Sequence, residues 1–163
     1  KALRMLTTLY RSAAVWTAAG LAGGLFYREF TKAHDVEGGT QLALVHTHAL
    51  ALGTTVLLVL MALVAALGPG VGRAFRWGVH TWNAGLALTV GGLLVKGCLQ
   101  VLKSPSADSP AIAGVSGLGH MILTTAFVLI FVGLAPPVRA RAASETADRA
   151  VAADAQGLTG SGS

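Results

Sequence analysis

Four long apolar runs constrain the fold of this chain more than any other feature. They cover about residues 3–27, 41–67, 74–102 and 111–135. The hydrocarbon core of a bilayer is roughly 30 Å thick, and a helix needs about 20 apolar residues to cross it. Each run is long enough to do so. Backbone groups in lipid must bond internally, and the runs lack the alternation of barrel strands, so we expect helices.

Charge and composition support the same fold class. Only 12% of the residues are charged, against about 25% in typical soluble domains. We therefore predict an all-α protein, an integral membrane four-helix bundle over residues 1–136 whose surroundings are the lipid bilayer. Nothing in the chain indicates a nucleic-acid partner. Residues 137–163 are rich in alanine and charge and lack an apolar face, so we expect a disordered cytoplasmic tail.

The distribution of basic residues predicts the orientation. Lys1, Arg4 and Arg11 flank the start of the first run, Arg73 and Arg76 follow the second, and Arg139 follows the fourth, whereas the other two loops mix both signs of charge. The positive-inside rule then places both termini and the middle turn in the cytoplasm. We expect a multi-pass protein of a bacterial cytoplasmic (inner) membrane. A cleaved signal peptide is the alternative for the first run, but no convincing cleavage site follows it, and a retained helix is favoured.

Three histidines lie inside the apolar runs, His46 and His48 in the second and His120 in the fourth. An ionisable side chain in hydrocarbon is costly and by default marks a functional site. At 1.5 Å per residue, His46, His48 and His120 lie roughly 8, 11 and 13 Å from the outer ends of their helices. Lys96 lies roughly 9 Å from the outer end of the third helix. These residues therefore share one layer in the outer half of the bilayer.

His46 and His48 cannot both face the axis of an undistorted bundle, because residues two apart point about 200° apart. We favour His46 as the inward residue and assign His48 a supporting position beside the site. Gly53 follows His46 by seven residues on the same face. A flat ligand or a neighbouring helix can approach closely there. Which of the two histidines faces the site stays open at this point.

Imidazoles on facing helices suit the axial positions of a porphyrin iron. The chain has no Cys-x-x-Cys-His motif, which excludes a covalently attached c-type haem. We therefore predict a haem b held by His46 and His120, with Arg28 and Lys96 neutralising its propionates. Electron transfer, or haem or gas sensing, is the expected role. The sequence identifies no catalytic residue.

Two other functions are compatible with these residues. The three histidines, with Met121 as a soft donor, suit copper or another transition metal in a binding or transport protein. The histidines can also serve only to bond helices together in a non-catalytic membrane subunit.

Three segments carry a resemblance to a known family. Residues 24–32 (GLFYREFTK), 45–53 (VHTHALALG) and 113–120 (AGVSGLGH) resemble an uncharacterised family of small bacterial four-helix membrane proteins. That resemblance implies the four-helix fold and no activity. Residues 46–53 are also similar, more weakly, to the histidine-bearing second helix of the catalytic subunits of haem-copper oxidases and nitric oxide reductases. There the first histidine of a comparable run ligates the low-spin haem, which implies that role for His46.

The same weaker likeness has an implication for assembly. Those catalytic subunits arrange their helices in arcs around a pseudo-threefold axis. The likeness therefore implies a homo-oligomer, a dimer or a trimer, together with a possible redox partner. The chain lacks the full set of metal-binding histidines of those subunits.

Overall fold

The computed structural model describes residues 2–160, and this part of the chain contains helices and short connections but no strand. The predicted all-α fold is therefore confirmed. The elements are α1 (Ala2–Ala33), α2 (Ala43–His48), the π-helix η1 (Ala49–Thr55), α3 (Val56–Leu67), the 3-10 turn η2 (Gly68–Gly70), α4 (Arg73–Val101), the 3-10 turn η3 (Pro105–Asp108) and α5 (Pro110–Gly160). Because α2, η1 and α3 run on without a break, the chain forms four long helical rods.

The apolar runs correspond closely to these rods. Three helical stretches are long and apolar enough to cross a membrane, Ala43–Leu67, Arg73–Val101 and Pro110–Ala153, so the chain is a membrane protein. The first helix continues six residues beyond the predicted end at residue 27, to Ala33. It is not among the three, because small and polar residues dilute its apolar content. Its crossing of the membrane stays a prediction.

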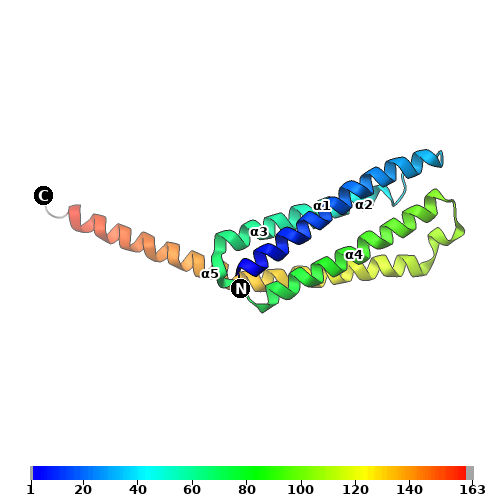
Figure 1. The fold of residues 1–163 in the computed structure, drawn as a ribbon. Coiled ribbons are helices and arrows are strands. Elements are labelled where there is room, and N and C mark those ends of the chain that lie inside the picture. Colours follow the sequence, from blue (N-terminus) through cyan, green and yellow to red (C-terminus); the bar gives the residue numbers. More distant parts are fainter. Residues whose placement is uncertain (1, 161–163) are drawn as a thin grey trace.

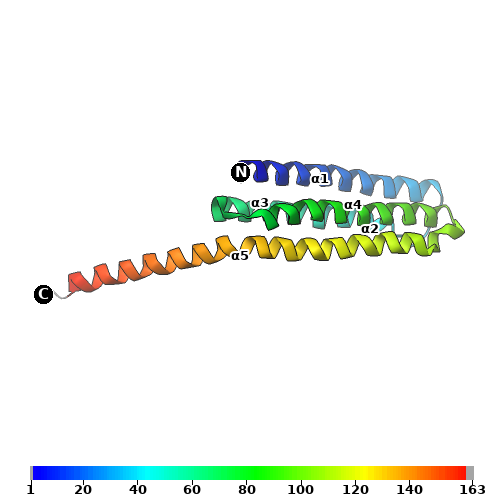
Figure 2. The same cartoon turned by 90° about the horizontal axis from the view of Figure 1, so that it is seen from below.

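The rods form a staggered, open array (Figures 1 and 2). Helix α1 packs along α2, η1 and α3, while α4 packs against α2 and η1 on one side and against α5 along its length. Helix α5 reaches the second rod only at α3. Among the described residues, no Cα atom of α5 lies within 8 Å of α1, α2 or η1. Helices α1 and α5 are therefore the two edges of the array.

The two ends of the array differ. The start of α1, the η2 turn and Pro137 lie together at one end, which we call the terminal end (Figure 1). Gly68 begins the turn with φ 74°, a left-handed conformation that glycine adopts without steric cost. The connections over residues 34–42 and 102–109 lie at the opposite end, which we call the loop end.

Small residues bring α4 and α5 together. Gly85 of α4 lies against the backbone of Gly119, and Gly92 lies against Ser116. A methyl group at either glycine would overlap α5. Close backbone approach through small residues is the usual way in which membrane helices gain packing energy, since lipid supplies no hydrophobic drive for association. This seam fixes the rotation of α5, and hence the direction in which His120 points.

The final segment differs from the prediction. Helix α5 continues through Pro136 and Pro137 to Gly160, where composition predicted a disordered tail from residue 137. Alanine, arginine and glutamate favour helix intrinsically, and Arg141 pairs with Glu145 one turn later at 3.0 Å. Residues 138–153 are all exposed, so local propensity rather than packing maintains this part of the helix. Residues 161–163 lie outside the described residues.

Candidate functional site

His46, the residue favoured as the inward ligand, lies in the seam between α2 and α1. A methyl group added at Gly24 of α1 would lie 3.6 Å from the His46 Cβ. The ring Nε2 lies 3.5 Å from the Thr47 hydroxyl, and the buried Nδ1 has no hydrogen-bond partner among the described residues. His46 therefore faces the first helix, on the side of α2 that is remote from α5.

His48 lies on the other side of α2. It is half-buried, and its Nδ1 lies 2.9 Å from the carbonyl of Leu44. Leu52 follows it by one turn and packs against the core, and the Leu52 carbonyl accepts a 3.0 Å hydrogen bond from the indole of Trp82 on α4. His48 therefore lies four residues before the carbonyl that bonds Trp82 of α4.

His120 points from α5 toward the same side of α4. Phe127 lies two turns further along α5, at a spacing that keeps it on the face of His120. The Phe127 ring packs edge-on against Trp82, with 4.6 Å between ring centroids. The His120 ring is exposed, and its Nδ1 lies 2.8 Å from the Ser116 carbonyl. Trp82 thus connects the faces that carry His48 and His120.

We call the region between α2 and α5, beside α4, the His48/His120 groove. In the described part of the chain, no Cα atoms of α2 and α5 lie within 8 Å of each other, and Trp82 of α4 is fully buried between the two faces. Of the three histidines, His46 lies against Gly24 of α1, whereas His48 and His120 each bond to a carbonyl of their own helix. Among the described residues, no cluster of three or more His, Cys, Asp or Glu side chains is placed to hold a metal ion.

Lys96 lies at the loop end of this groove. It follows Gly92, the glycine that packs on Ser116, by one turn of α4. Its ammonium is 3.9 Å from the carboxylate of Asp108, and 28% of its side chain is exposed, so it extends outward toward the membrane surface. Gln100, one turn further, accepts a 2.8 Å hydrogen bond from the backbone N–H of Gln41 and ties the start of the second rod to α4.

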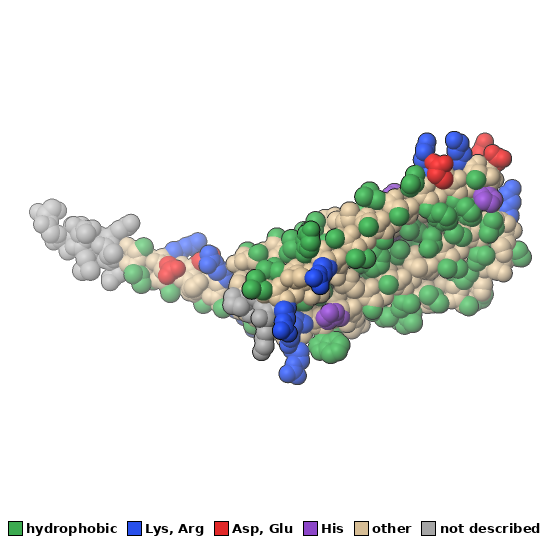
Figure 3. Space-filling view, viewed as in Figure 1, with side chains coloured by type: hydrophobic (Ala, Val, Ile, Leu, Met, Phe, Trp, Pro, Cys, Tyr) green, Lys and Arg blue, Asp and Glu red, His purple; other side chains and the backbone are tan. Residues whose placement is uncertain are grey.

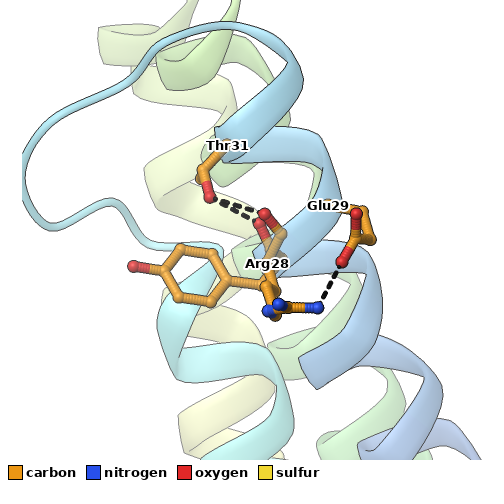
Figure 4. A network of polar contacts seen from close by, with 4 residues as sticks. Arg28, Glu29 and Thr31 are labelled. Atoms are coloured by element: carbon orange, nitrogen blue, oxygen red, sulfur yellow. Dashed lines mark hydrogen bonds and ion pairs between the residues drawn. The ribbon is translucent and has the colours of Figure 1, made fainter.

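Arg28 lies elsewhere. It is exposed near the end of α1, and its guanidinium donates a 2.7 Å hydrogen bond to Glu29 (Figure 4). The neighbouring Thr31 hydroxyl donates to the carbonyls of Tyr27 and Arg28. Since no part of α1 approaches α5, the structure does not bring Arg28 to the His48/His120 groove.

Gly53 serves as a point of close helix approach. The side chain of Trp16 on α1 lies directly over it, and a methyl group at this position would overlap the indole. Of the two uses that the sequence allowed for Gly53, a flat ligand or a near helix, the structure shows the second.

A polar layer at the middle of the rods was not anticipated. The Trp16 indole donates a 2.8 Å hydrogen bond to the Asn83 side chain, and Thr17 and Thr54 share a 2.9 Å hydrogen bond. Asn83 in turn donates to the carbonyl of Val79. The sequence signal for this layer was Asn83 itself. A side-chain amide flanked by apolar residues in a membrane span requires hydrogen-bond partners. The adjacent π-helix η1 gave no signal in the sequence.

Comparison with known proteins identifies a family but no activity. A model of the family described as "Protein of unknown function (DUF2871)" matches residues 6–136. No curated protein and no solved structure matches the chain.

Proposed function

The chain belongs to this family of proteins of unknown function, and from its geometry we propose that it binds haem b between α2 and α5. In this proposal His48 and His120 would each supply an imidazole to the haem iron, and His48 replaces His46 as the ligand on α2. Bound in this way, the haem would supply a redox centre suited to electron transfer. Sensing of haem or of a gas is the alternative use of the same site.

One observation carries the proposal. In both His48 and His120 the Nδ1 atom faces the carbonyl of the residue four positions earlier, at 2.9 and 2.8 Å. A carbonyl oxygen only accepts, so Nδ1 carries the proton and Nε2 keeps its lone pair. Metal-ligating histidines are typically held in this way, with the second nitrogen bonded to a carbonyl or carboxylate. His46 has no such bond at its Nδ1, whereas the exposed His34 at the loop end does, with its Nδ1 2.9 Å from the Phe30 carbonyl.

The separation of the helices and the charge nearby support the proposal. Helices α2 and α5 have no Cα atoms within 8 Å of each other among the described residues, and the exposed Phe127 packs against the buried Trp82 between them. Lys96, at the loop end, would hold a propionate in exchange for Asp108. When bound, the haem supplies the redox centre, and the protein fixes its axial ligands and limits access of water.

The proposal includes the orientation and assembly expected from the sequence. Both termini and the η2 turn would face the cytoplasm of a bacterial cell, which places the groove in the outer half of the inner membrane. The free edges of the array are compatible with a homo-oligomer.

An absorption spectrum of detergent-purified protein from haem-replete cells tests the proposal. We expect a Soret band that shifts on reduction with dithionite and is lost in His48→Ala and in His120→Ala. The matched control is His46→Ala, which removes an imidazole from the same helix and should keep the band. A colourless wild-type protein overturns the proposal. Loss of the band in His46→Ala with retention in His48→Ala overturns the ligand assignment.

Elemental analysis of the same sample separates the alternatives. An iron content proportional to the Soret absorbance supports haem. Bound copper without a Soret band indicates a metal-binding or transport protein. If alanine at both His48 and His120 leaves cofactor content unchanged and alters only stability, the histidines bond helices and the site assignment is wrong.

A further inference from the structure

A second recess lies at the terminal end of the array, far from the His48/His120 groove. It has a volume of about 320 Å³ and is lined by Arg73, Arg76, Trp77 and His80. The spacing of these residues over the first two turns of α4 places them on one face of the helix. The space-filling view shows Lys or Arg side chains and a histidine gathered at this end of the molecule (Figure 3). All four lining residues are exposed.

In the part of the chain that the structure describes, the two arginines of the recess have no intramolecular carboxylate partner, unlike Arg28, Lys96 and Arg141. At the loop end, Arg28 pairs with Glu29 and Lys96 with Asp108. Among the described residues, neither Arg73 nor Arg76 has a carboxylate within 4.0 Å. Two unpaired guanidiniums on adjacent turns repel each other, and an external anion relieves that repulsion. The positive charge of this recess therefore favours the binding of an anion from outside the chain.

The other two lining residues indicate the environment of that anion. Trp77 is 62% exposed on a helix that enters the apolar part of the protein within a turn. An indole with an apolar body and a polar N–H favours the headgroup level of a bilayer. His80 lies about 4.5 Å deeper along the helix axis than Trp77. With Trp77 at the headgroup level, the recess would extend from the lipid phosphate to the upper part of the acyl chains.

We propose that this recess binds the phosphate of an anionic phospholipid. Arg73 and Arg76 donate hydrogen bonds to the phosphate oxygens, a geometry that the planar guanidinium fits well. Trp77 lies along the glycerol and upper acyl region, and His80 contacts the lipid below the phosphate. The site would hold one specific lipid at the terminal end of α4, independently of any cofactor in the groove.

Fluorescence quenching in vesicles tests the proposal on the full chain. Wild-type protein is reconstituted in phosphatidylcholine vesicles that contain a minor fraction of brominated phosphatidylglycerol or, in a second set, brominated phosphatidylcholine. Subtracting the emission of Trp77→Phe isolates Trp77 from the two other tryptophans. We expect brominated phosphatidylglycerol to quench Trp77 well beyond its mole fraction and brominated phosphatidylcholine only in proportion to it. Equal quenching by the two lipids overturns the proposal.

Charge variants separate a site from a general surface potential. Arg73→Gln with Arg76→Gln should lower the apparent affinity for phosphatidylglycerol by about tenfold, because each cation near the surface contributes appreciably to lipid attraction. The control is Arg4→Gln with Arg139→Gln, which removes the same charge from exposed positions outside the recess and should change the affinity by about twofold at most. Equal effects of the two pairs overturn the proposal. Displacement of the lipid by inorganic phosphate at low concentration also overturns it and assigns the recess to a soluble phosphate.

Discussion

Single side chains at the middle of the rods determine how closely α1 approaches η1. Trp16 covers Gly53 and also bonds Asn83, so one residue connects the first three rods. In a membrane span, shape complementarity and hydrogen bonds stabilise such contacts. Burial of apolar surface contributes little free energy there, because the alternative environment of that surface is lipid. Two predictions follow from this arrangement.

Gly53→Ala should destabilise the protein by about 1–3 kcal/mol, because the added methyl group overlaps the Trp16 side chain. Unfolding in mixed micelles with increasing sodium dodecyl sulfate measures the change. The control is Gly117→Ala on α5, where nothing lies within 4 Å of the added atom. Its stability should stay the same or rise slightly from better helix propensity. If Gly53→Ala leaves the stability unchanged, α1 does not pack on η1 in this way.

The hydrogen bond between Trp16 and Asn83 should give a coupling energy of about 0.6 kcal/mol, the average measured for such bonds in a membrane protein, and no more than about 1.7 kcal/mol. A double-mutant cycle with Trp16→Phe and Asn83→Ala measures it in the same unfolding assay. A parallel cycle with Trp77→Phe and Asn83→Ala should show no coupling, because Trp77 is exposed and does not bond Asn83. Equal coupling in the two cycles would contradict the contact.

At the scale of elements, the π-helix η1 decides which histidine faces which neighbour. It starts directly after His48 and contains Leu52, whose carbonyl accepts from Trp82. The Thr55 hydroxyl bonds the Leu50 carbonyl five residues earlier, as the wider turn allows. A π-turn adds residues to a helix without breaking it, and such turns are frequent at functional sites. The histidines above η1 are thereby rotated relative to α3 below it.

Deleting Ala51, an exposed residue of η1, should restore α-helical spacing and turn His48 by about 100° relative to α3. If the proposed function holds, the Soret band is lost while the helical content measured by far-ultraviolet circular dichroism stays constant. Deleting Ala147 from the exposed end of α5 is the matched control and should leave both signals unchanged. Full retention of the band after deletion of Ala51 would show that η1 does not determine the position of His48 in the site.

Long apolar runs made the helices predictable, because the bilayer fixes both length and composition, but not the end of α5, which continues 25 residues beyond its apolar run, from residue 135 to Gly160. The choice between His46 and His48 was not predictable in the same way. A helical wheel separates the two residues by about 200° but does not say where α1 and α4 lie around α2. That information comes from contacts distant in sequence, such as Gly24 with His46 and Trp82 with Leu52. The π-turn was also hidden, since residues 49–55 are compatible with an ordinary helix.

For the whole molecule, the expected orientation can be tested by accessibility. In a Cys98→Ser background, which removes the single cysteine, Ser106→Cys reports on the loop end and Ser144→Cys on the exposed extension of α5. A membrane-impermeant maleimide should label position 106 in intact cells and position 144 only after the membrane is opened, because the basic flanks favour the cytoplasm. The opposite labelling pattern would invert the topology and move the groove to the inner leaflet.

The two unlike edges of the array determine the symmetry of any assembly. If α1 meets α1, or α5 meets α5, the result is a two-fold pair that leaves the other edge facing lipid. If α1 of one copy meets α5 of the next, each subunit extends the row, and the row ends only when it closes into a ring. Cross-linking between cysteines on the two edge helices therefore distinguishes a pair from a ring before any subunit has been counted. In the ring, a neighbour's first helix would also close the open side of the His48/His120 groove.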